Sequence, residues 1–523
     1  MAFKEVLKWS ETKRDLLIII CLSLALKLFI LLFVEAINSD GVAYITAAQE
    51  FAKGHFKEGF RISRMPFYPL LIVLFHSIVP NWVAAARLVS LLTSVLTIIP
   101  LYLLTKKLFE QKVALWACVA FALSPLPNHL SVEVIRDPAY VFFFAWTIYF
   151  AHDAVESNKL WFFLMAGAFS IFAFLCRMEG LILFPCLIVF FLYIALKDAD
   201  KRKTILKGTL IYLAIPILIL SSFILYLQSK DRFFLARIKH FNRLSYMKYH
   251  LQDLLKGEFL QNYKLIYSRM EDFEKTLPRK RGGLNFAEIA RHHMYAVYFI
   301  GLLEGFINAI FPPYIIPLVV GFRKSQIGRY AFLFFVLTCY LLLLYCSYIK
   351  RDTLRVRHLL APAFLVFPLI GLGLHRIVNS FKKSTWQRSV AILFILVLGG
   401  LSTYKSIDIT WKQDDVVVRA GQWIGKRALR RAPMITTDRR IPFYAGKGKD
   451  YVSYRGSDHR AMEVLAVEKG YDVLVIRTRK KRMKSGPQLE KYRKTKEFVG
   501  VKDIVSIYIS PNFRTTMREK NRG

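Results

Sequence analysis

The feature that most constrains this chain is a series of apolar segments, several of which are long enough to cross a lipid bilayer. An α-helix needs roughly 20 apolar residues to span the hydrocarbon core. The 523 residues are 55% hydrophobic, which excludes an ordinary soluble protein. The sequence therefore predicts a polytopic α-helical membrane protein.

Lysine and arginine in the short connections predict how these segments are oriented. The connections "TKKLFEQK", "KDADKRK", "FRKSQIGR" and "HRIVNSFKKSTWQR" fall on the same side as the N-terminus, which the positive-inside rule makes cytoplasmic. The long segments 37–81, 228–295 and 405–523 then lie outside. We expect eleven spans, with cores at residues 16–36, 82–104, 112–127, 138–154, 160–176, 181–196, 205–227, 296–320, 330–349, 359–376 and 388–404.

Two of the outer segments have helix or strand patterns of their own. In residues 37–81, "AYITAAQEFAKG" and "MPFYPLLIVLFHSIVP" predict two short helices on the outer membrane surface. In residues 405–523, the β-branched runs "YDVLVIRT" and "IVSIYIS" alternate with the amphipathic helix pattern "VVVRAGQWIGKRAL". We expect residues 405–523 to form a small extracytoplasmic α/β domain.

Charge and cysteine content exclude several kinds of partner. The chain has 75 Lys+Arg against 37 Asp+Glu, but these basic residues are dispersed among the spans. This pattern fits loop orientation and anionic lipids better than nucleic acid, so we expect no nucleic-acid partner. The six cysteines lie in apolar runs without a CxxC pair, so neither a disulfide framework nor a zinc site is expected.

Ionisable residues at the outer ends of the spans are the functional candidates, because charges near a membrane are costly to keep. They form four groups: Asp40 in "SDGVAY"; Glu133, Arg136 and Asp137 in "SVEVIRDPAY"; Arg177 and Glu179 in "FLCRMEGL"; and Lys350, Arg351, Arg355, Arg357 and His358 in "YIKRDTLRVRHLLAP".

Each group also has a purely structural explanation. Asp40 would serve as the N-cap of the following helix, and Asp137 before a proline is a natural helix start. Arg177 and Glu179 would form an ion pair at a tight turn. The cationic cluster at 350–358 would meet lipid phosphates.

Taken together, the four groups indicate one chemistry. Arginine holds phosphate oxygens bidentately, and a carboxylate can take a proton from an attacking hydroxyl. Two carboxylates and several arginines on one membrane face predict transfer of a group from a lipid-linked phosphate to an acceptor alcohol. The sequence has no Walker loop, no Rossmann GxGxxG and no HExxH motif, so we expect neither a nucleotide nor a zinc site.

The order of these motifs resembles the GT-C superfamily of integral-membrane glycosyltransferases, above all the branch of protein O-mannosyltransferases and lipid A aminoarabinose transferases. The resemblance covers most of residues 15–376 and implies a GT-C catalytic domain over residues 1–404. The matching segments are "SDGVAYITAAQEFAKG", "RMPFYPLLIVLF", "NWVAAARLVSLL", "SPLPNHLSVEVIRDPAYVFFF", "CRMEGLILFP" and "RVRHLLAP".

The resemblance implies roles for individual residues. Asp40 matches the acidic residue of the first outer loop that is taken as the general base, and Asp137 matches a second acidic position. Where the family often shows Asp-Glu, this chain has Asp40-Gly41, which removes any role for the second acid. The predicted substrate-binding residues are Tyr44, Arg64, Tyr68, Glu133, Arg136, Arg177, Glu179, Arg355, Arg357 and His358.

Family members use a polyprenyl-phosphate-linked sugar and invert the anomeric centre. The implied enzyme is a hexosyl or pentosyl transferase without a cofactor, surrounded by membrane lipids and acting on an acceptor glycan, lipid or protein. Some relatives, the oligosaccharyltransferases, require a divalent metal, but their DE-type ligand clusters are not evident here. The lack of outer cysteines and of an endoplasmic-reticulum retrieval signal favours a prokaryotic cytoplasmic membrane.

Alternatives stay open at this point. A lipid-linked sugar flippase would predict charges near mid-membrane and two repeated halves. A non-catalytic GT-C scaffold would bind a lipid or a partner. The basic run "RTRKKRMK" at 477–484 is either a contact for an anionic acceptor or a solvated face.

Overall fold

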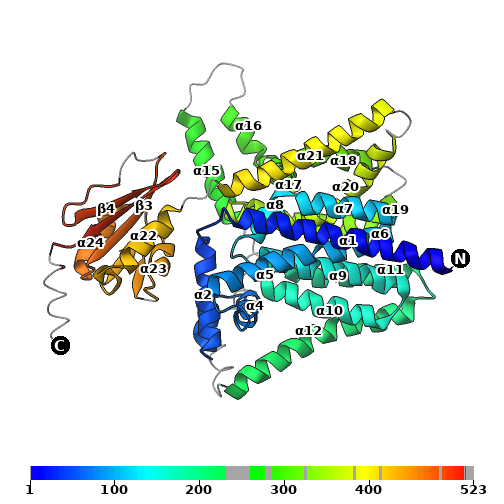
Figure 1. Ribbon diagram of the computed structural model, residues 1–523, viewed down its shortest axis with the longest axis horizontal. Coiled ribbons are helices and arrows are strands. Elements are labelled where there is room, and N and C mark those ends of the chain that lie inside the picture. Colours follow the sequence, from blue (N-terminus) through cyan, green and yellow to red (C-terminus); the bar gives the residue numbers. More distant parts are fainter. Residues whose placement is uncertain are drawn as a thin grey trace.

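The computed structural model describes residues 2–230, 260–276, 286–322, 327–380, 385–411, 415–448, 450–481, 486–511 and 513. The chain forms a helical bundle followed by a small α/β domain (Figure 1). The N-terminus lies at one end of the bundle and the α/β domain at the other. The prediction of a mostly helical membrane protein that carries a small sheet is confirmed.

The bundle is built from helices of very different length and polarity. Those that make up its body are α1 (Ala2–Leu31), α5 (Trp82–Leu96), α6 (Ile98–Leu108), α7 (Gln111–Leu123), α8 (Pro125–Ser131), α9 (Asp137–Ser157), α10 (Leu160–Cys176), η1 (Met178–Ile182), α11 (Leu183–Lys197), α12 (Arg202–Lys230), α17 (Met294–Ile310), η3 (Pro312–Tyr314), α18 (Ile315–Gly321), α19 (Ile327–Arg351), η5 (Val356–Leu359), α20 (Leu360–Ser380) and α21 (Thr385–Trp411).

Length and apolar composition mark five membrane-crossing helical segments among the described residues, or seven if two bent pairs each form one span. All seven coincide with predicted spans, and the other four predicted spans fall on α1, α9, α10 and α21, so the count of eleven stays a prediction. The segments are Trp82–Leu108, Met178–Lys197, Arg202–Ser229, Gly328–Arg351, Val356–Ser380, and the pairs Gln111–Leu123 with Pro125–Ser131 (bent by 56°) and Met294–Ile310 with Pro312–Gly321 (bent by 89°).

The centre of the bundle is α20, which is apolar on every side and buried over its first fifteen residues. A helix that is hydrophobic all round belongs in an interior. Two glycines let neighbouring helices approach it closely. A Cβ on Gly371 would lie 2.6 Å from the backbone nitrogen of Ala117, and one on Gly373 would lie 1.6 Å from the carbonyl oxygen of Pro317. The segment between α19 and α20, which contains Arg355 and Arg357, therefore leads directly into a tightly packed helix.

Three short helices cover the end of the bundle between α1 and α5: α2 (Ser39–Ala52), α3 (Phe56–Ile62) and α4 (Phe67–His76). The sequence predicted two, and the extra helix is α3. Gly54, whose φ is +77°, ends α2, and α3 then packs Phe60 edge-on against Phe51 with their ring centres 5.2 Å apart. Figure 1 shows α2 running across the end of the bundle, transverse to α1.

The α/β domain has a five-stranded sheet in the order β2-β1-β3-β5-β4. Strand β1 is parallel to β2 and β3, whereas β5 is antiparallel to β3 and β4. The strands are β1 (Met434–Thr436), β2 (Tyr451–Ser453), β3 (Val473–Arg479), β4 (Arg493–Val499) and β5 (Asp503–Ile509).

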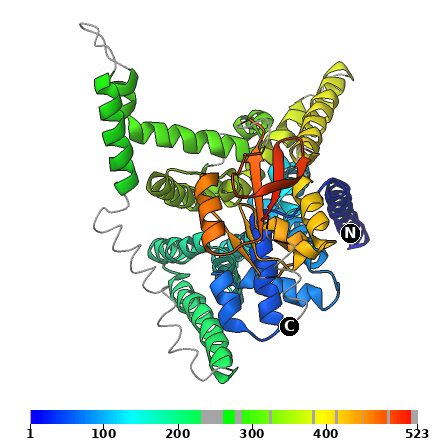
Figure 2. The same cartoon turned by 90° about the vertical axis from the view of Figure 1, so that its left-hand side faces the viewer.

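Successive side chains of a strand point to opposite faces of the sheet, and helices cover both faces here. The helix α22 (Val416–Gly425) covers the face that carries Val473 and Val475. The helix α24 (His459–Glu468) covers the face that carries Leu474 and Ile476. The short helices η6 (Ala428–Arg430) and α23 (Arg440–Tyr444) complete the domain. Viewed from that end, the domain lies in front of the bundle (Figure 2).

Two predicted regions are described only in part. Of the outer loop 228–295, the structure describes α15 (Gln261–Thr276), α16 (Phe286–His292) and their immediate neighbours, and residues 231–259 and 277–285 lie outside the described residues. Of the basic run at 477–484, residues 482–484 lie outside them. The helix α21 continues through the predicted domain boundary at residue 404 and ends at Trp411.

Candidate active site

The first turn of α2 is held by a residue that the sequence analysis did not single out. Asn38 is the N-cap: its Oδ1 accepts the backbone N–H of Gly41 at 2.6 Å. Its Nδ2 donates to Oε2 of Glu133 at 2.9 Å and to the carbonyl oxygen of Val134 at 3.1 Å. The explanation of Asp40 as the helix cap is therefore wrong, and its carboxylate is available for other contacts.

The carboxylate of Asp40 lies between arginines that come from distant parts of the chain. Nη2 of Arg357 donates to Oδ2 of Asp40 at 2.9 Å across 317 residues of sequence. Nη2 of Arg439, from the α/β domain, lies 3.5 Å from Oδ1. Arg355 is a third guanidinium that acts on the same carboxylate. We call Asp40, Arg355, Arg357 and Arg439 the outer cluster.

The outer cluster is half-buried, and its electrostatics favour an ionised carboxylate. The side chains of Asp40 and Arg357 are 35% and 22% exposed. Partial burial raises the pKa of Asp40. The hydrogen bond and charge of Arg357, together with the charges of Arg439 and Arg355, lower the pKa by more than burial raises it. The net pKa lies below the ordinary carboxyl value.

A glycine beside Asp40 explains why this chain lacks a second acid there. A Cβ added to Gly41 would lie 2.9 Å from Cβ of Val134 and 3.1 Å from its carbonyl oxygen. Contacts that short require the backbone to move. Gly41 therefore lets α2 approach the segment before α9 closely, which a glutamate would prevent.

A second cluster of ion pairs is more deeply buried. The guanidinium of Arg177 pairs with the carboxylate of Asp137, at the start of α9, and with Oε1 of Glu179 at 2.8 Å. The side chains of Arg177 and Asp137 are only 4% and 2% exposed. We call Asp137, Arg177 and Glu179 the inner cluster. His358, next to Arg357, is close enough to interact electrostatically with Glu179 and Arg177.

Aromatic rings connect the two clusters. The ring of Tyr44, on α2, meets the ring of Tyr68 edge-on at 5.2 Å between centres, and the guanidinium of Arg136 lies 5.9 Å from the centre of the Tyr44 ring. The charges of Asp40 and Asp137 also act electrostatically on Tyr44. The hydroxyl of Tyr68 is fully buried and hydrogen-bonded to Oγ of Ser90 at 2.8 Å. This hydrogen bond fixes Tyr68, whose ring packs against the ring of Tyr44.

The comparisons with known proteins agree with this architecture. A family model described as dolichyl-phosphate-mannose-protein mannosyltransferase matches residues 63–227. The archaeal oligosaccharyltransferase AglB from Archaeoglobus fulgidus, in complex with an inhibitory peptide and a dolichol-phosphate, superposes with a TM-score of 0.54 at 12% identity, covering 90% of this chain and 69% of that chain. ArnT from Cupriavidus metallidurans bound to undecaprenyl phosphate superposes with a TM-score of 0.54 at 12% identity, covering 94% of this chain and 97% of that chain.

The chain has the GT-C fold. It is an integral membrane protein, as the apolar helices indicate. A comparison with curated protein sequences finds no match.

Within this GT-C fold, most of the predicted site residues come together at one end of the bundle. Asp40, Arg355 and Arg357 meet in the outer cluster, and Asp137, Arg177 and Glu179 meet in the inner cluster. Tyr44 and Arg136 lie between the clusters, and Glu133 accepts a hydrogen bond from the cap residue. Arg64 is exposed in the turn between α3 and α4.

Two residues of this site were missed in the sequence. Asn38 had a usable signal, because asparagine is a favoured N-cap and it stands directly before the helical pattern. Arg439 had none, since it is one of many basic residues in the α/β domain and its partner Asp40 lies 399 positions away, 439 minus 40. Only the packing of the α/β domain on α2 reveals it.

The residues around Asp40 do not suit a divalent cation. Both carboxylate oxygens face guanidinium groups, and three arginines act on this one acid. Among the residues that the structure describes, no group of three or more His, Cys, Asp or Glu side chains has the arrangement of a metal site.

Proposed function

We propose that the protein is an inverting glycosyltransferase that moves a hexosyl or pentosyl group from a polyprenyl-phosphate donor to an acceptor hydroxyl. The observation that carries the proposal is the 2.9 Å ion pair between Asp40 and Arg357. It joins a candidate base to an arginine, a side chain suited to phosphate oxygens, at the end of a GT-C bundle. The lipid phosphates in the AglB and ArnT complexes support the class of donor.

The proposed reaction is a single displacement. The acceptor oxygen attacks the anomeric carbon while the bond from that carbon to the phosphate oxygen breaks. The acceptor's proton passes to the carboxylate of Asp40, and polyprenyl phosphate leaves with the bonding electrons. Arg355, Arg357 or Arg64 would hold the developing negative charge.

The substrate and Asp40 would compete for the same guanidinium groups. While Arg357 binds the carboxylate, it keeps the pKa of Asp40 low and makes Asp40 a weak base. A donor phosphate that takes over Arg357 would release the carboxylate and raise its basicity. Binding of the donor would thereby activate the base.

The inner cluster has a supporting role in this mechanism. Asp137, the predicted second catalytic residue, is closed off from solvent by its pair with Arg177, and Glu179 shares that arginine. We assign these three residues to holding the start of α9 and η1 in place beneath the site. Tyr44 and Arg136, which lie between the two clusters, are the better candidates for contact with the sugar.

The site would face the outside of a prokaryotic cytoplasmic membrane. The α/β domain and the N-terminus lie at opposite ends of the bundle. The basic connections favour a cytoplasmic N-terminus, which puts Asp40 and the α/β domain outside. The acceptor would approach from that aqueous side and the donor from the membrane.

The test is transfer in membranes that contain the protein and a radiolabelled polyprenyl-phosphate sugar. We expect label to move to an acceptor with the wild-type chain and not with Asp40→Asn. The matched control is Asp272→Asn, an exposed acid on α15. Label that crosses the membrane without transfer would instead indicate a flippase, and neither transfer nor crossing would indicate a scaffold.

A further inference from the structure

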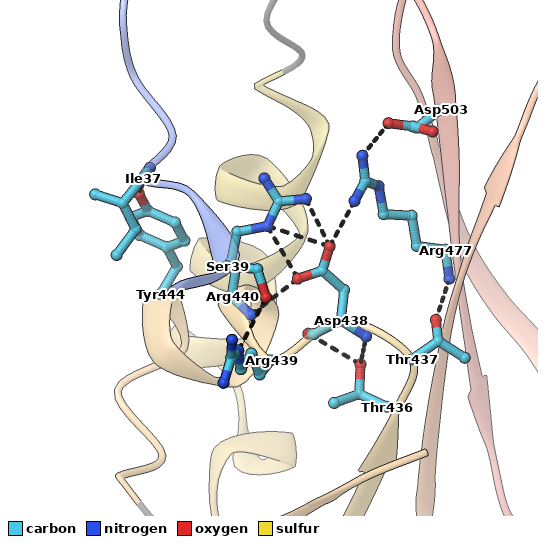
Figure 3. Close-up of polar contacts among 10 residues, drawn as sticks. All are labelled: Ile37, Ser39, Thr436, Thr437, Asp438, Arg439, Arg440, Tyr444, Arg477 and Asp503. Carbon is cyan, nitrogen blue, oxygen red and sulfur yellow. Dashed lines mark hydrogen bonds and ion pairs between the residues drawn. The ribbon is translucent and has the colours of Figure 1, made fainter. Parts of the chain in front are cut away.

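The turn between β1 and α23 of the α/β domain meets the first turn of α2. Nε of Arg439 donates to Oγ of Ser39 at 2.9 Å (Figure 3). Nη2 of Arg439 lies 3.5 Å from Oδ1 of Asp40. The side chain of Arg439 is 32% exposed, so a ligand in the aqueous phase can reach it. A guanidinium has five N–H donors, and the described contacts of Arg439 use two of its nitrogen atoms.

The residue before Arg439 is locked in place by its own ion pairs. The carboxylate of Asp438 accepts from Nη2 of Arg440 at 2.6 Å and from Nη1 of Arg477 at 2.9 Å, and Arg477 pairs in turn with Asp503 (Figure 3). Two carboxylates here meet two guanidinium groups, so these four charges balance. These ion pairs do not include Arg439, whose side chain points to α2 of the helical bundle.

A separate contact seats the α/β domain on the link between α1 and α2. The hydroxyl oxygen of Tyr444 accepts the backbone N–H of Ile37 at 2.8 Å (Figure 3). Arg87, on α5, donates to the carbonyl oxygen of Glu35 at 3.1 Å. The position of Arg439 relative to Asp40 is therefore set by hydrogen bonds on both sides of the domain boundary.

The charges of the outer cluster do not balance. Arg355, Arg357 and Arg439 bring three positive charges to the one negative charge of Asp40, which leaves an excess of two. Such an excess, on side chains that bind oxyanions in a fixed fork, suits a phosphate monoester, whose charge near neutral pH is close to minus two. The polyprenyl phosphate that leaves in the proposed reaction is such a monoester, whereas the donor diester carries one negative charge. Guanidinium groups on both oxygens of Asp40 are already spaced to grip two oxygens of one anion.

We propose that Arg439 belongs to the phosphate site, so that the α/β domain supplies one of the guanidinium groups that bind the substrate. This inference rests on the proposed function and adds a specific residue and domain to it. The phosphate comes either from the polyprenyl donor or from a phosphorylated acceptor. Both present phosphate oxygens to Arg439.

The test is binding to the full chain reconstituted in nanodiscs. The first arm measures the affinity for undecaprenyl phosphate, and the second measures the affinity for inorganic phosphate on protein already saturated with undecaprenyl phosphate. The variants are Arg439→Gln, Arg439→Lys and Arg357→Gln. The matched control is Arg493→Gln, which changes an exposed arginine on the edge strand β4. Unfolding temperatures show whether each variant keeps its fold.

Loss of a charged hydrogen bond predicts that Arg439→Gln weakens one arm by about tenfold or more, with partial recovery in Arg439→Lys. A loss in the first arm assigns Arg439 to the donor phosphate, and a loss in the second arm alone assigns it to a phosphate on the acceptor. If Arg357→Gln weakens binding but Arg439→Gln matches wild type in both arms, this inference is wrong and the proposed function stands. If the wild-type chain does not bind undecaprenyl phosphate, both fail.

Discussion

The inner and outer clusters are made from the same chemical groups, yet they differ in burial and in the ratio of charges. The inner cluster places two carboxylates, one buried and one 17% exposed, on one buried guanidinium, and the outer cluster places three guanidinium groups on one half-exposed carboxylate. A buried, closely paired charge contributes to holding the structure, and breaking the pair is costly. A half-exposed, unbalanced charge can exchange its partner for a ligand. Burial and charge ratio thus separate a supporting site from a reacting one.

The largest effect among these predictions is expected from replacing Arg177, which both carboxylates of the inner cluster share. Arg177→Met leaves two buried carboxylates without their cation and should lower the free energy of unfolding by about 3–5 kcal/mol. The same change in the outer cluster, Arg357→Met, should cost about 1 kcal/mol or less, because that pair is partly solvated. Denaturant unfolding of both variants in detergent gives the comparison. Equal losses of stability would remove the distinction between the clusters.

Removal of one carboxylate from each cluster should separate chemistry from folding. Asp40→Asn should lower the rate of transfer by about 10²–10⁴-fold through loss of the general base, with an unfolding temperature close to wild type. Asp137→Asn should instead lower the unfolding temperature, since Arg177 loses its partner. Transfer rates and unfolding temperatures of the two variants are the measurements. An active Asp40→Asn enzyme would contradict the assignment of the base.

The outer cluster also depends on how closely α2 packs. Gly41→Ala should destabilise the chain by about 1–3 kcal/mol, because the new methyl group would lie 2.9 Å from Cβ of Val134. Gly400→Ala, on α21, is the control, since a Cβ there has no atom within 4 Å. It should leave stability unchanged or slightly raised. Equal unfolding temperatures for the two variants would show that α2 has room to move.

The smallest expected effect is a displacement in the pH dependence. The folded pKa of Asp40 lies below its ordinary value, so its ion pairs contribute stability above that ordinary value and lose it as the pH falls through the folded pKa. Arg439→Gln removes one of the charges that lower this pKa, so the acidic limb of the transfer rate should move to higher pH. The pH–rate profile of the variant against wild type measures this. A limb that moves to lower pH would show that Arg439 does not act on Asp40.

Much of the architecture could be predicted because it depends on local patterns. Apolar length identified five helical segments of the structure that are long and apolar enough to cross a membrane, and two bent helix pairs besides, and β-branched runs identified β3 and β5. The order of short motifs brought Asp40 and Arg357 into one candidate site, and the structure joins them. The predicted spans and strands needed only the local pattern of each segment, whereas the roles given to Asp40 and Arg357 rested on the resemblance to the GT-C superfamily.

The remainder depends on contacts between distant parts of the chain. Asp40 and Asn38 are equally plausible caps in the sequence, and the choice depends on how Asn38 meets Glu133 and Val134. The role of Gly41 is set by the backbone that it faces across the bundle end. Arg439 is positioned by the ion pairs of the neighbouring Asp438 and by the hydrogen bond between Tyr444 and Ile37 that docks the α/β domain. No local pattern records any of these arrangements.

The seat of Tyr444 on Ile37 has a consequence for how the protein matures. The turn after the first helix is completed by a hydroxyl group 407 positions later in the chain, and Ser39 receives its partner from 400 positions later. A ribosome makes that turn early and its partners nearly last. The nascent chain can therefore insert all its helices before the outer cluster is assembled. The outer cluster is therefore complete only when the final domain has folded and docked, and a copy truncated before that domain lacks Arg439.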